Sequence, residues 1–325
     1  MKLIIQIPCY NEAETLPQVF NELPKNLRGI TSIETLLIDD GSTDKSVQVA
    51  EKFGVNHILS FKQNMGLARA FKEGLDACIK FGADIIVNTD ADNQYCAKDI
   101  EKLIAPILEG SADIVIGARP IEDIKDFSWI KKKLQRFGSS VVRSLSLTDI
   151  PDATSGFRAF SRTAALRINI FSQYTYTLET LIQAGENKLK VVSIPVRVNR
   201  KTRESRLLKS IPHYIIHSVA TMLRICVLYR PFHYFFTVGS IMFFAGFLLG
   251  LRFLFYYFMG TGTGHIQSLI LASVLLTVGF QMFLFGLLAD VVATNRKLAE
   301  DIQARVKNME LTMCVDLSPK DNPNT

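Results

Sequence analysis

The stretch Asp84-Ile-Ile-Val-Asn-Thr-Asp-Ala-Asp-Asn-Gln94 decides how this chain folds. Its apolar first half predicts a buried strand over 84–89, and the acids Asp90 and Asp92 follow at the carboxyl end of that strand. In open α/β sheets, ligands bind at this edge. Two carboxylates and the nearby Gln94 amide offer oxygen ligands to one divalent cation, and Mg²⁺ or Mn²⁺ held in this way commonly bridges substrate phosphates. A solvated turn is the alternative for an isolated pair of acids, so the surrounding chain decides between the two.

The segments around this stretch alternate between strand and helix patterns. We predict strands over 3–8, 33–38, 57–60, 84–89 and 113–117, and helices over 12–23, 44–53, 66–81 and 98–109. Helix 66–81 carries its apolar residues at helical spacing, and Ser42 or Thr43 is expected to cap helix 44–53. Strands that alternate with helices of this length predict an α/β fold with a mainly parallel sheet built from βαβ units.

From 119 to 210 the pattern is less regular and more basic. We predict a basic helix over 131–147, a turn at 152–158 into a short strand, a helix over 177–185 and a strand over 190–198. The segment 199–209 carries five basic residues and one acid. A solvated loop is one interpretation of this segment. Its position just before a long apolar region favours the other, a segment that binds phosphate or a membrane surface.

Two long uncharged runs, Phe235–Leu251 and Ile266–Ala289, follow in the last third of the chain. Each is long enough to cross about 30 Å of hydrocarbon. Two buried helices of a large soluble core are the alternative. The loop 259–265 lacks Lys and Arg, whereas both outer flanks are basic. The positive-inside rule therefore predicts an integral cell-membrane protein with a helical hairpin, and with its first domain and both termini in the cytoplasm.

The predicted domains follow from these patterns. They are an α/β domain over 1–206, an amphipathic juxtamembrane helix over 207–231, transmembrane helices over 232–258 and 266–291, and a cytoplasmic tail over 295–325. The amphipathic helix is expected to lie on the membrane surface. Gly246 and Gly250 have the GxxxG spacing that lets helices approach closely, a weak signal by itself. A homo-oligomer formed through the hairpin is a separate expectation.

Composition narrows the function classes. The chain has 325 residues, 48% of them hydrophobic, and a formal net charge of +6. Basic clusters at 131–143 and 197–209 suit a phosphate-bearing ligand or an anionic membrane surface rather than nucleic acid. Five cysteines without CxxC spacing argue against a disulfide framework or a zinc site, and the N-terminal apolar run is too short for a signal peptide. The chain has no GxxxxGK[ST] or GxGxxG loop, which argues against P-loop kinases and Rossmann dehydrogenases.

Three motifs in chain order closely resemble those of the family 2 glycosyltransferases, which have the GT-A fold. They are Ile7-Pro-Cys-Tyr-Asn-Glu12, Asp39-Asp-Gly-Ser-Thr-Asp44 and Asp90-Ala-Asp-Asn-Gln94. Ser155-Gly-Phe-Arg158 and the C-terminal hairpin are similar to the polyprenyl-phosphate branch, which includes dolichol-phosphate mannose synthases and bactoprenol glucosyltransferases. The Q-x-x-R-W signature of the polymerising relatives is absent, which disfavours polymerisation.

The resemblance implies a role for each matching residue. Residues expected to bind the nucleotide sugar are Pro8, Tyr10, Glu12, Asp40, Asp90, Ala91, Arg203 and Arg206. Asp92 and Gln94 are expected to hold the Mg²⁺ or Mn²⁺ cofactor, and the catalytic residues are expected to be Asp152, Arg119, Arg136 and Arg143. Asp152 stands where a base is sometimes proposed. Because a lipid phosphate is largely ionised at pH 7, with a second pKa of about 6, we favour an orienting role for this acid.

The resulting hypothesis is a metal-dependent, inverting transfer of one hexose from a nucleotide sugar to a polyprenyl phosphate at the cytoplasmic membrane face. UDP-glucose or UDP-N-acetylglucosamine is the expected donor and GDP-mannose the alternative, with undecaprenyl or dolichyl phosphate as acceptor. A hydroxyl-bearing lipid such as diacylglycerol is a second possible acceptor, and it would need a true general base. The non-enzymatic alternative is a sugar-nucleotide sensor, which would bind nucleotide without turnover.

Overall fold

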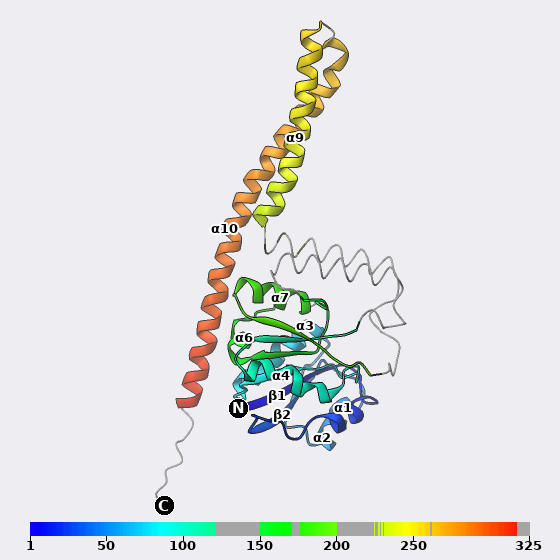
Figure 1. The fold of residues 1–325 in the computed structure, drawn as a ribbon, viewed down its shortest axis with the longest axis vertical. Coiled ribbons are helices and arrows are strands. Elements are labelled where there is room, and N and C mark those ends of the chain that lie inside the picture. Colours follow the sequence, from blue (N-terminus) through cyan, green and yellow to red (C-terminus); the bar gives the residue numbers. More distant parts are fainter. Residues whose placement is uncertain are drawn as a thin grey trace, which may run out of the picture. The chain divides into compact units, whose positions relative to one another are not determined.

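The computed structural model of the protein describes residues 1–120, 150–170, 176–199, 224, 227, 229, 231–260 and 262–316. The chain divides into two compact units, one made of Met1–Ile215 with Ile302–Thr325 and one made of Ile216–Asp301. The first unit holds a twisted sheet with helices around it, and the second is a helical hairpin (Figure 1).

The first unit is built on a seven-stranded sheet with the order β3-β2-β1-β4-β6-β5-β7. Its strands are β1 (Lys2–Cys9), β2 (Ser32–Asp39), β3 (His57–Ser60), β4 (Ile85–Asn88), β5 (Ile114–Ala118), β6 (Arg158–Ser161) and β7 (Val191–Pro195). Strand β6 runs antiparallel to both of its neighbours, and the other paired strands run parallel. The predicted mainly parallel α/β sheet is therefore confirmed.

Helices cover both faces of this sheet. They are α1 (Leu16–Glu22), α2 (Ser46–Lys52), α3 (Leu67–Lys80), η1 (Ala97–Asp99), α4 (Ile100–Leu108), α6 (Arg162–Arg167) and α7 (Thr177–Glu186). Alternate residues of β1 point to opposite faces. Leu3, Ile5 and Ile7 belong to one buried cluster with residues of α1, α2 and α4. On the other face, Gln6 approaches Gly74 of α3 so closely that a Cβ at Gly74 would lie 2.6 Å from the Gln6 Oε1.

Two local predictions differ from the structure. Helix α1 begins only at Leu16, because the residues before it form a loop with the segment after β2. The predicted cap of α2 by Ser42 or Thr43 is wrong. The N-cap residue of α2 makes no side-chain cap hydrogen bond. Ser42 Oγ instead accepts a hydrogen bond from the Asn11 amide at 3.0 Å.

The strand directions place several loops at one edge of the sheet. The parallel strands β1, β2, β4, β5 and β7 all end there, and the antiparallel β6 begins there. The loops that follow the parallel strands and the turn that precedes β6 therefore meet at this edge. In open α/β sheets, this is the edge that binds ligands.

The second unit contains α9 (Pro231–Phe258), η2 (Gly262–His265) and the first part of α10 (Ile266–Asp316). Glycines let α9 and α10 approach closely, since a Cβ at Gly239 would lie 3.0 Å from the carbonyl oxygen of Gly279. A Cβ at Gly246 would lie 2.9 Å from the Ala272 carbonyl, whereas Gly250 meets nothing within 4 Å. Gly246 thus serves the hairpin itself.

Helix α9 and the part of α10 over Ile266–Glu310 are long and apolar enough to cross a membrane, by length and composition. Many of their large apolar side chains are exposed, for example Ile241 at 66%, Phe244 at 62% and Leu248 at 64%. Such exposure does not fit the alternative of two helices buried in a soluble core. The helix α10 continues well beyond the predicted end at residue 291. The predicted basic helix at 131–147 and nearly all of the amphipathic helix at 207–231 lie outside the described residues.

Candidate active site at the carboxyl edge of the sheet

Two acids act on the carboxyl of Asp90, the residue that follows β4 and Thr89. Asp90 and Asp92 are half-buried there, and Glu12 from the loop after β1 is 9% exposed. Burial raises the pKa of the Asp90 carboxyl to about 7, and the negative charges of Asp92 and Glu12 add to this effect. The positive charge of Arg119 opposes it. The residues predicted from the acidic motif therefore share one electrostatic environment in which negative charge is crowded.

The Asp90 carboxylate lies against the turn that precedes β6. A Cβ at Gly156 would be 3.0 Å from each Asp90 carboxylate oxygen and 3.0 Å from the Tyr176 hydroxyl. The Gly156 carbonyl accepts a hydrogen bond from Asn88 Nδ2 at 2.8 Å, and the same amide donates to the Tyr176 hydroxyl at 3.2 Å. A side chain at position 156 would therefore crowd the Asp90 carboxylate, and Asn88 fixes both groups that border it.

The loops after β1 and β2 are joined by Asn11. This residue has the left-handed φ of 55°, and its Oδ1 accepts hydrogen bonds from the amides of Thr43 at 2.8 Å and Asp44 at 3.3 Å. Asparagine adopts this conformation more readily than other non-glycine residues. Of the predicted nucleotide residues that precede Asn11, Pro8 is buried within β1 and Tyr10 is 41% exposed.

Asp40 supports the loop before α3. Its two carboxylate oxygens accept the backbone amides of Met65 at 2.6 Å and Gly66 at 2.9 Å. Burial raises the pKa of the Asp40 carboxyl, while these two amide hydrogen bonds oppose the rise. The structure thus places Asp40 at the expected edge and gives it a partner in the 65–66 turn that the motif did not predict.

Thr15 connects α1 to the acidic loop. Its hydroxyl lies 2.8 Å from the Ala91 carbonyl and 3.1 Å from Glu12 Oε2. Ala91 is buried, so its contribution at this position is its backbone. The segments that follow β1 and β4 are therefore linked through a residue that the motifs did not single out.

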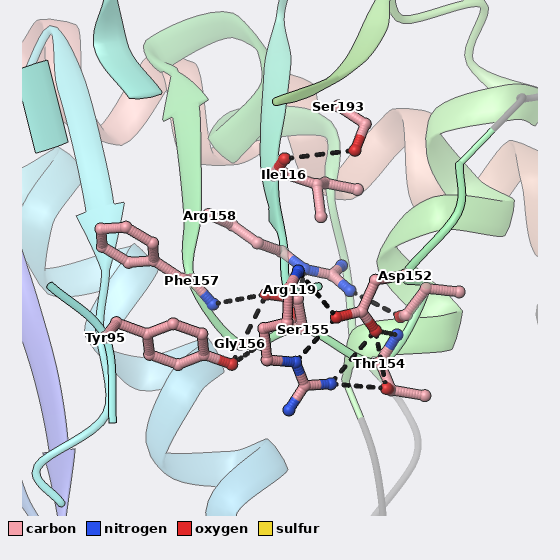
Figure 2. Close-up of polar contacts among 11 residues, drawn as sticks. Tyr95, Ile116, Arg119, Asp152, Thr154, Ser155, Gly156, Phe157, Arg158 and Ser193 are labelled. Atoms are coloured by element: carbon pink, nitrogen blue, oxygen red, sulfur yellow. Dashed lines mark hydrogen bonds and ion pairs between the residues drawn. The ribbon is translucent and has the colours of Figure 1, made fainter. Parts of the chain in front are cut away.

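Arg119 and Asp152 form an ion pair with two hydrogen bonds (Figure 2). Arg119 Nε donates to Asp152 Oδ2 at 2.7 Å, and Arg119 Nη2 donates to Oδ1 at 3.1 Å. Thr154 adds hydrogen bonds from its amide at 3.2 Å and from its hydroxyl at 2.9 Å, both to Oδ1. Burial opposes ionisation of Asp152, but the ion pair with Arg119 outweighs burial and lowers the pKa of this carboxyl.

Arg158 is a buried cation beneath this edge. It is fully buried and donates to the carbonyl oxygens of Ser155, Thr177 and Ala153, each at 2.8 Å. Figure 2 shows Arg158 beside Ser155. Burial lowers the pKa of Arg158 to about 10. Its charge also favours ionisation of Asp90. Arg158 therefore both shapes the turn at 153–156 and supplies positive potential below the acids.

Tyr95 holds the same turn from the other side. Its ring stacks on Phe157 with 5.0 Å between centroids, and its hydroxyl accepts the Gly156 amide at 3.1 Å (Figure 2). Several residues that shape the site were thus missed by the sequence analysis. For Asn88, a signal was available, because a polar amide inside an apolar strand pattern is informative when the strand is buried. Gln6 carries the same signal and donates to Asn88 Oδ1 at 2.9 Å.

The described part of the chain contains no group of three or more His, Cys, Asp or Glu side chains that could hold a metal ion by themselves. Asp92 and Gln94 lie side by side in the loop after β4, and Asp92 Oδ1 accepts the Gln94 amide at 3.0 Å. Four predicted site residues, Arg136, Arg143, Arg203 and Arg206, lie outside the described residues. Their placement stays a prediction.

Comparisons with known proteins agree with this geometry. Residues 4–168 match the family described as glycosyl transferase family 2. The UDP-N-acetylglucosamine–dolichyl-phosphate N-acetylglucosaminyltransferase of Methanococcus voltae is 31% identical over 216 residues, which cover 59% of this chain and 83% of that protein. The dolichol-phosphate mannosyltransferase of Pyrococcus furiosus is 32% identical over 230 residues, which cover 67% of this chain and 62% of that protein.

Solved structures share the fold. Glucosyl-3-phosphoglycerate synthase from Mycobacterium tuberculosis, in a complex with Mn²⁺, UDP and glucosyl-3-phosphoglycerate, superposes with a TM-score of 0.52. The match covers 68% of this chain and 79% of that chain at 19% sequence identity. At this identity, the likeness concerns the fold alone.

Proposed function

Because the chain belongs to glycosyl transferase family 2, we propose that it transfers one hexose from a nucleotide sugar to a polyprenyl phosphate at a membrane surface. The observation that carries this proposal is the gathering of Asp90, Asp92 and the Arg119–Asp152 pair at the carboxyl edge of the sheet. Carboxylates can hold the divalent cation that binds a donor diphosphate, and an arginine can bind the acceptor phosphate directly.

Two further observations support a lipid acceptor. The Methanococcus voltae and Pyrococcus furiosus relatives are both named for transfer to a dolichol-type phosphate. The chain also carries two helices of membrane-spanning length and composition. The positive-inside pattern predicts that the α/β domain and both termini lie in the cytoplasm. A homo-oligomer formed through the hairpin remains a prediction.

The side chains of the acidic loop after β4 fit a divalent cation. Asp92 and Gln94 would supply hard oxygen ligands, and a cation held there would favour the ionised form of Asp90, whose pKa is raised first by burial and then by the charges of Asp92 and Glu12. The described residues hold no group of three His, Cys, Asp or Glu side chains, which fits a cation that would be shared with a phosphorylated substrate rather than held by the protein alone. When bound, Mg²⁺ or Mn²⁺ supplies Lewis acidity that offsets the charge on the leaving nucleoside diphosphate.

The chain's own residues bind and orient the two substrates. Arg119 is held by Asp152, so its guanidinium keeps one orientation towards a phosphate group. The acceptor phosphate is largely ionised at pH 7, with a second pKa of about 6, and therefore needs no base. Its oxygen would attack the anomeric carbon as the bond from that carbon to the diphosphate oxygen breaks. This single displacement inverts the anomeric configuration.

For the donor, we propose UDP-glucose or UDP-N-acetylglucosamine, with GDP-mannose as the alternative. The relatives include one protein named for UDP-N-acetylglucosamine and one named for mannose, so likeness alone does not choose between them. A hydroxyl-bearing lipid acceptor is less suited to the site, because the Asp152 carboxylate that would have to act as base already accepts hydrogen bonds on both oxygens.

A donor panel tests this function. Full-length protein in detergent would receive Mn²⁺ and each of UDP-glucose, UDP-N-acetylglucosamine, UDP-galactose and GDP-mannose, with and without undecaprenyl phosphate or diacylglycerol. We expect release of nucleoside diphosphate from one donor only when the lipid phosphate is present. Release that diacylglycerol supports equally well, or nucleotide binding without any release, would contradict the proposal.

Metal removal tests the role of the cation, with Asp113→Asn as the matched control. EDTA and the Asp92→Asn substitution should each abolish release, because both remove the cation from the diphosphate. Asp113→Asn changes the same functional group at the opposite edge of the sheet, where Asp113 Oδ2 accepts the Lys190 amide at 2.9 Å. This variant should keep its turnover. Unchanged turnover in EDTA would remove the metal from the mechanism.

A further inference from the structure

The acidic loop, defined as residues 90–94, contains a left-handed residue. Asn93 has a φ of 56° and is 5% exposed. Asp92 Oδ1 accepts the Gln94 amide at 3.0 Å, which closes a local turn around Asn93. Left-handed backbone outside glycine persists only where the surrounding structure holds it. Contacts from outside the loop help to hold the conformation that sets the directions of the Asp92 and Gln94 side chains, and one of them is the hydrogen bond from Asn93 Nδ2 to Glu22 Oε1 at 3.3 Å.

Asn199 makes further contacts of this kind. Its side-chain Nδ2 donates to the Asn93 carbonyl at 3.1 Å and to the Tyr95 carbonyl at 3.4 Å. Its backbone amide donates to the Gln94 carbonyl at 2.9 Å. Three consecutive carbonyls of the loop and its exit are thus held by one residue, which comes from a distant part of the chain after β7.

The segment that carries Asn199 is itself tied down. We call Val196–Asn199 the strap. Val198 forms an antiparallel bridge with Tyr95. The Arg197 amide donates to Asp99 Oδ2 at 2.8 Å, and the Arg197 carbonyl accepts the Cys96 amide at 3.3 Å. Because these contacts fix the backbone of Arg197 and Val198, the position of the adjacent Asn199 is also restrained.

We propose that Asn199 is a positioning residue for the acidic loop, and that it holds Asn93 left-handed so that Asp92 and Gln94 face a metal-bound nucleoside diphosphate. This inference rests on the proposed function of the site. Without the side-chain amide of Asn199, Asn93 can relax towards ordinary backbone angles. This relaxation turns the neighbouring peptide planes and redirects the side chains of Asp92 and Gln94. Residues that orient metal ligands affect metal affinity by about 10- to 100-fold.

The test uses the full-length protein in detergent and measures binding rather than turnover. UDP and GDP would be titrated by calorimetry with and without Mn²⁺ into wild type, Asn199→Ala and Asn187→Ala. Asn187 is the matched control, because its Nδ2 also donates to a backbone carbonyl, that of Gln183 at 3.0 Å, but at the end of α7. Thermal unfolding midpoints of all three proteins would be recorded in parallel.

We expect Asn199→Ala to weaken Mn²⁺-dependent nucleotide binding by about 10-fold or more, while its unfolding midpoint stays close to that of Asn187→Ala. A second pair of variants tests the mechanism. Glycine adopts positive φ without strain and alanine does not. Asn93→Gly should therefore tolerate the loss of the Asn199 amide better than Asn93→Ala does.

The outcomes separate the two proposals. Wild-type affinity in Asn199→Ala, or an equal loss of affinity with and without Mn²⁺, would overturn the positioning role and leave the proposed function standing. Equal behaviour of Asn93→Gly and Asn93→Ala in the Asn199→Ala background would also overturn it. If the wild type bound neither nucleotide with Mn²⁺, the proposed function would fail, and this inference would fail with it.

Discussion

The guanidinium of Arg119 holds the carboxylate of Asp152 at two points, Nε to Oδ2 at 2.7 Å and Nη2 to Oδ1 at 3.1 Å. Thr154 occupies Oδ1 further through its amide and its hydroxyl. A general base needs a free lone pair and a pKa near the working pH. Asp152 offers neither, since Oδ2 also accepts the Arg119 backbone amide at 3.4 Å, Oδ1 accepts three hydrogen bonds, and the ion pair lowers the pKa. The relationship favours an acid that orients an arginine.

From this pair we predict that Asp152→Asn retains measurable turnover with an unchanged pH profile, because it removes an orienting charge and no base. Arg119→Gln should be the more damaging change for stability. Asp152 is fully buried, whereas the Arg119 side chain is 11% exposed, so the arginine variant leaves a buried carboxylate without its ionic partner. Such a loss costs about 3–5 kcal/mol. Steady-state kinetics from pH 5 to 9 and thermal unfolding check both statements, over a range centred near neutrality.

The double variant sharpens this prediction. If Asp152 acts only through Arg119, the variant that combines Asp152→Asn with Arg119→Gln should lose no more activity than Arg119→Gln alone, since the two residues work as one unit. A base role would appear differently. Asp152→Asn would then lose the rising limb of its pH profile, while Arg119→Gln would keep that limb.

A second prediction concerns Gly156. A Cβ there would lie 3.0 Å from both Asp90 oxygens and from the Tyr176 hydroxyl, so Gly156→Ala must displace one of these groups. Overpacking of this kind costs about 1–3 kcal/mol. Because Asp90 is the less constrained neighbour, we expect the carboxylate to move and Mn²⁺-dependent nucleotide affinity to fall more than the unfolding midpoint does. Calorimetry and thermal unfolding of the same samples measure both.

Gly250→Ala is the control for Gly156→Ala, because a Cβ at Gly250 meets nothing within 4 Å. It should leave nucleotide affinity unchanged. A Gly156→Ala protein with wild-type affinity would mean that nucleotide binding does not depend on the position of the Asp90 carboxylate beside this glycine.

Much of the site's location was predictable from the sequence. The apolar run before Asp90 marks a buried strand, and alternation with helices makes the sheet mainly parallel, so the acids had to appear at the carboxyl edge. The same reasoning placed Asp40 and Arg119 after β2 and β5. These inferences depend only on local periodicity and on a general rule for strand ends.

The contacts that hold the site were not predictable in this way. Strand β6 lies between β4 and β5, and its Arg158 pairs with Asn88 on one side and with Ile116 on the other. The local sequence pattern of 158–161 predicts neither the direction of this strand nor its neighbours. Likewise, Asn199 reaches Asn93 only after β7 has been placed beside β5. Short helix α6 was missed, although Ser161 caps it by accepting the Ala164 amide at 3.1 Å.

The third prediction concerns acid stability and rests on Asp99. This acid is fully buried, and it accepts the Arg197 guanidinium at 2.8 Å and the Lys102 ammonium at 3.1 Å. Burial alone would raise the pKa of Asp99, but the hydrogen bonds from Arg197 and Lys102 outweigh it and lower the pKa to about 2. In the unfolded chain, an aspartate has a pKa of about 3.9.

Because the pKa is lower in the folded state, Asp99 stabilises the fold fully above about pH 4, and this stabilisation is lost as the pH falls towards about 2. Asp99→Asn should therefore unfold at a lower temperature than wild type at pH 7, and the difference should shrink steadily over that acid range. Asp113→Asn controls for the removal of a charge, since the Asp113 carboxylate accepts the Lys190 backbone amide at 2.9 Å. Thermal unfolding of the three proteins from pH 7 to pH 2 makes the comparison. A difference between wild type and Asp99→Asn that stays constant with pH would show that the carboxylate charge contributes nothing and that the variant acts through packing alone.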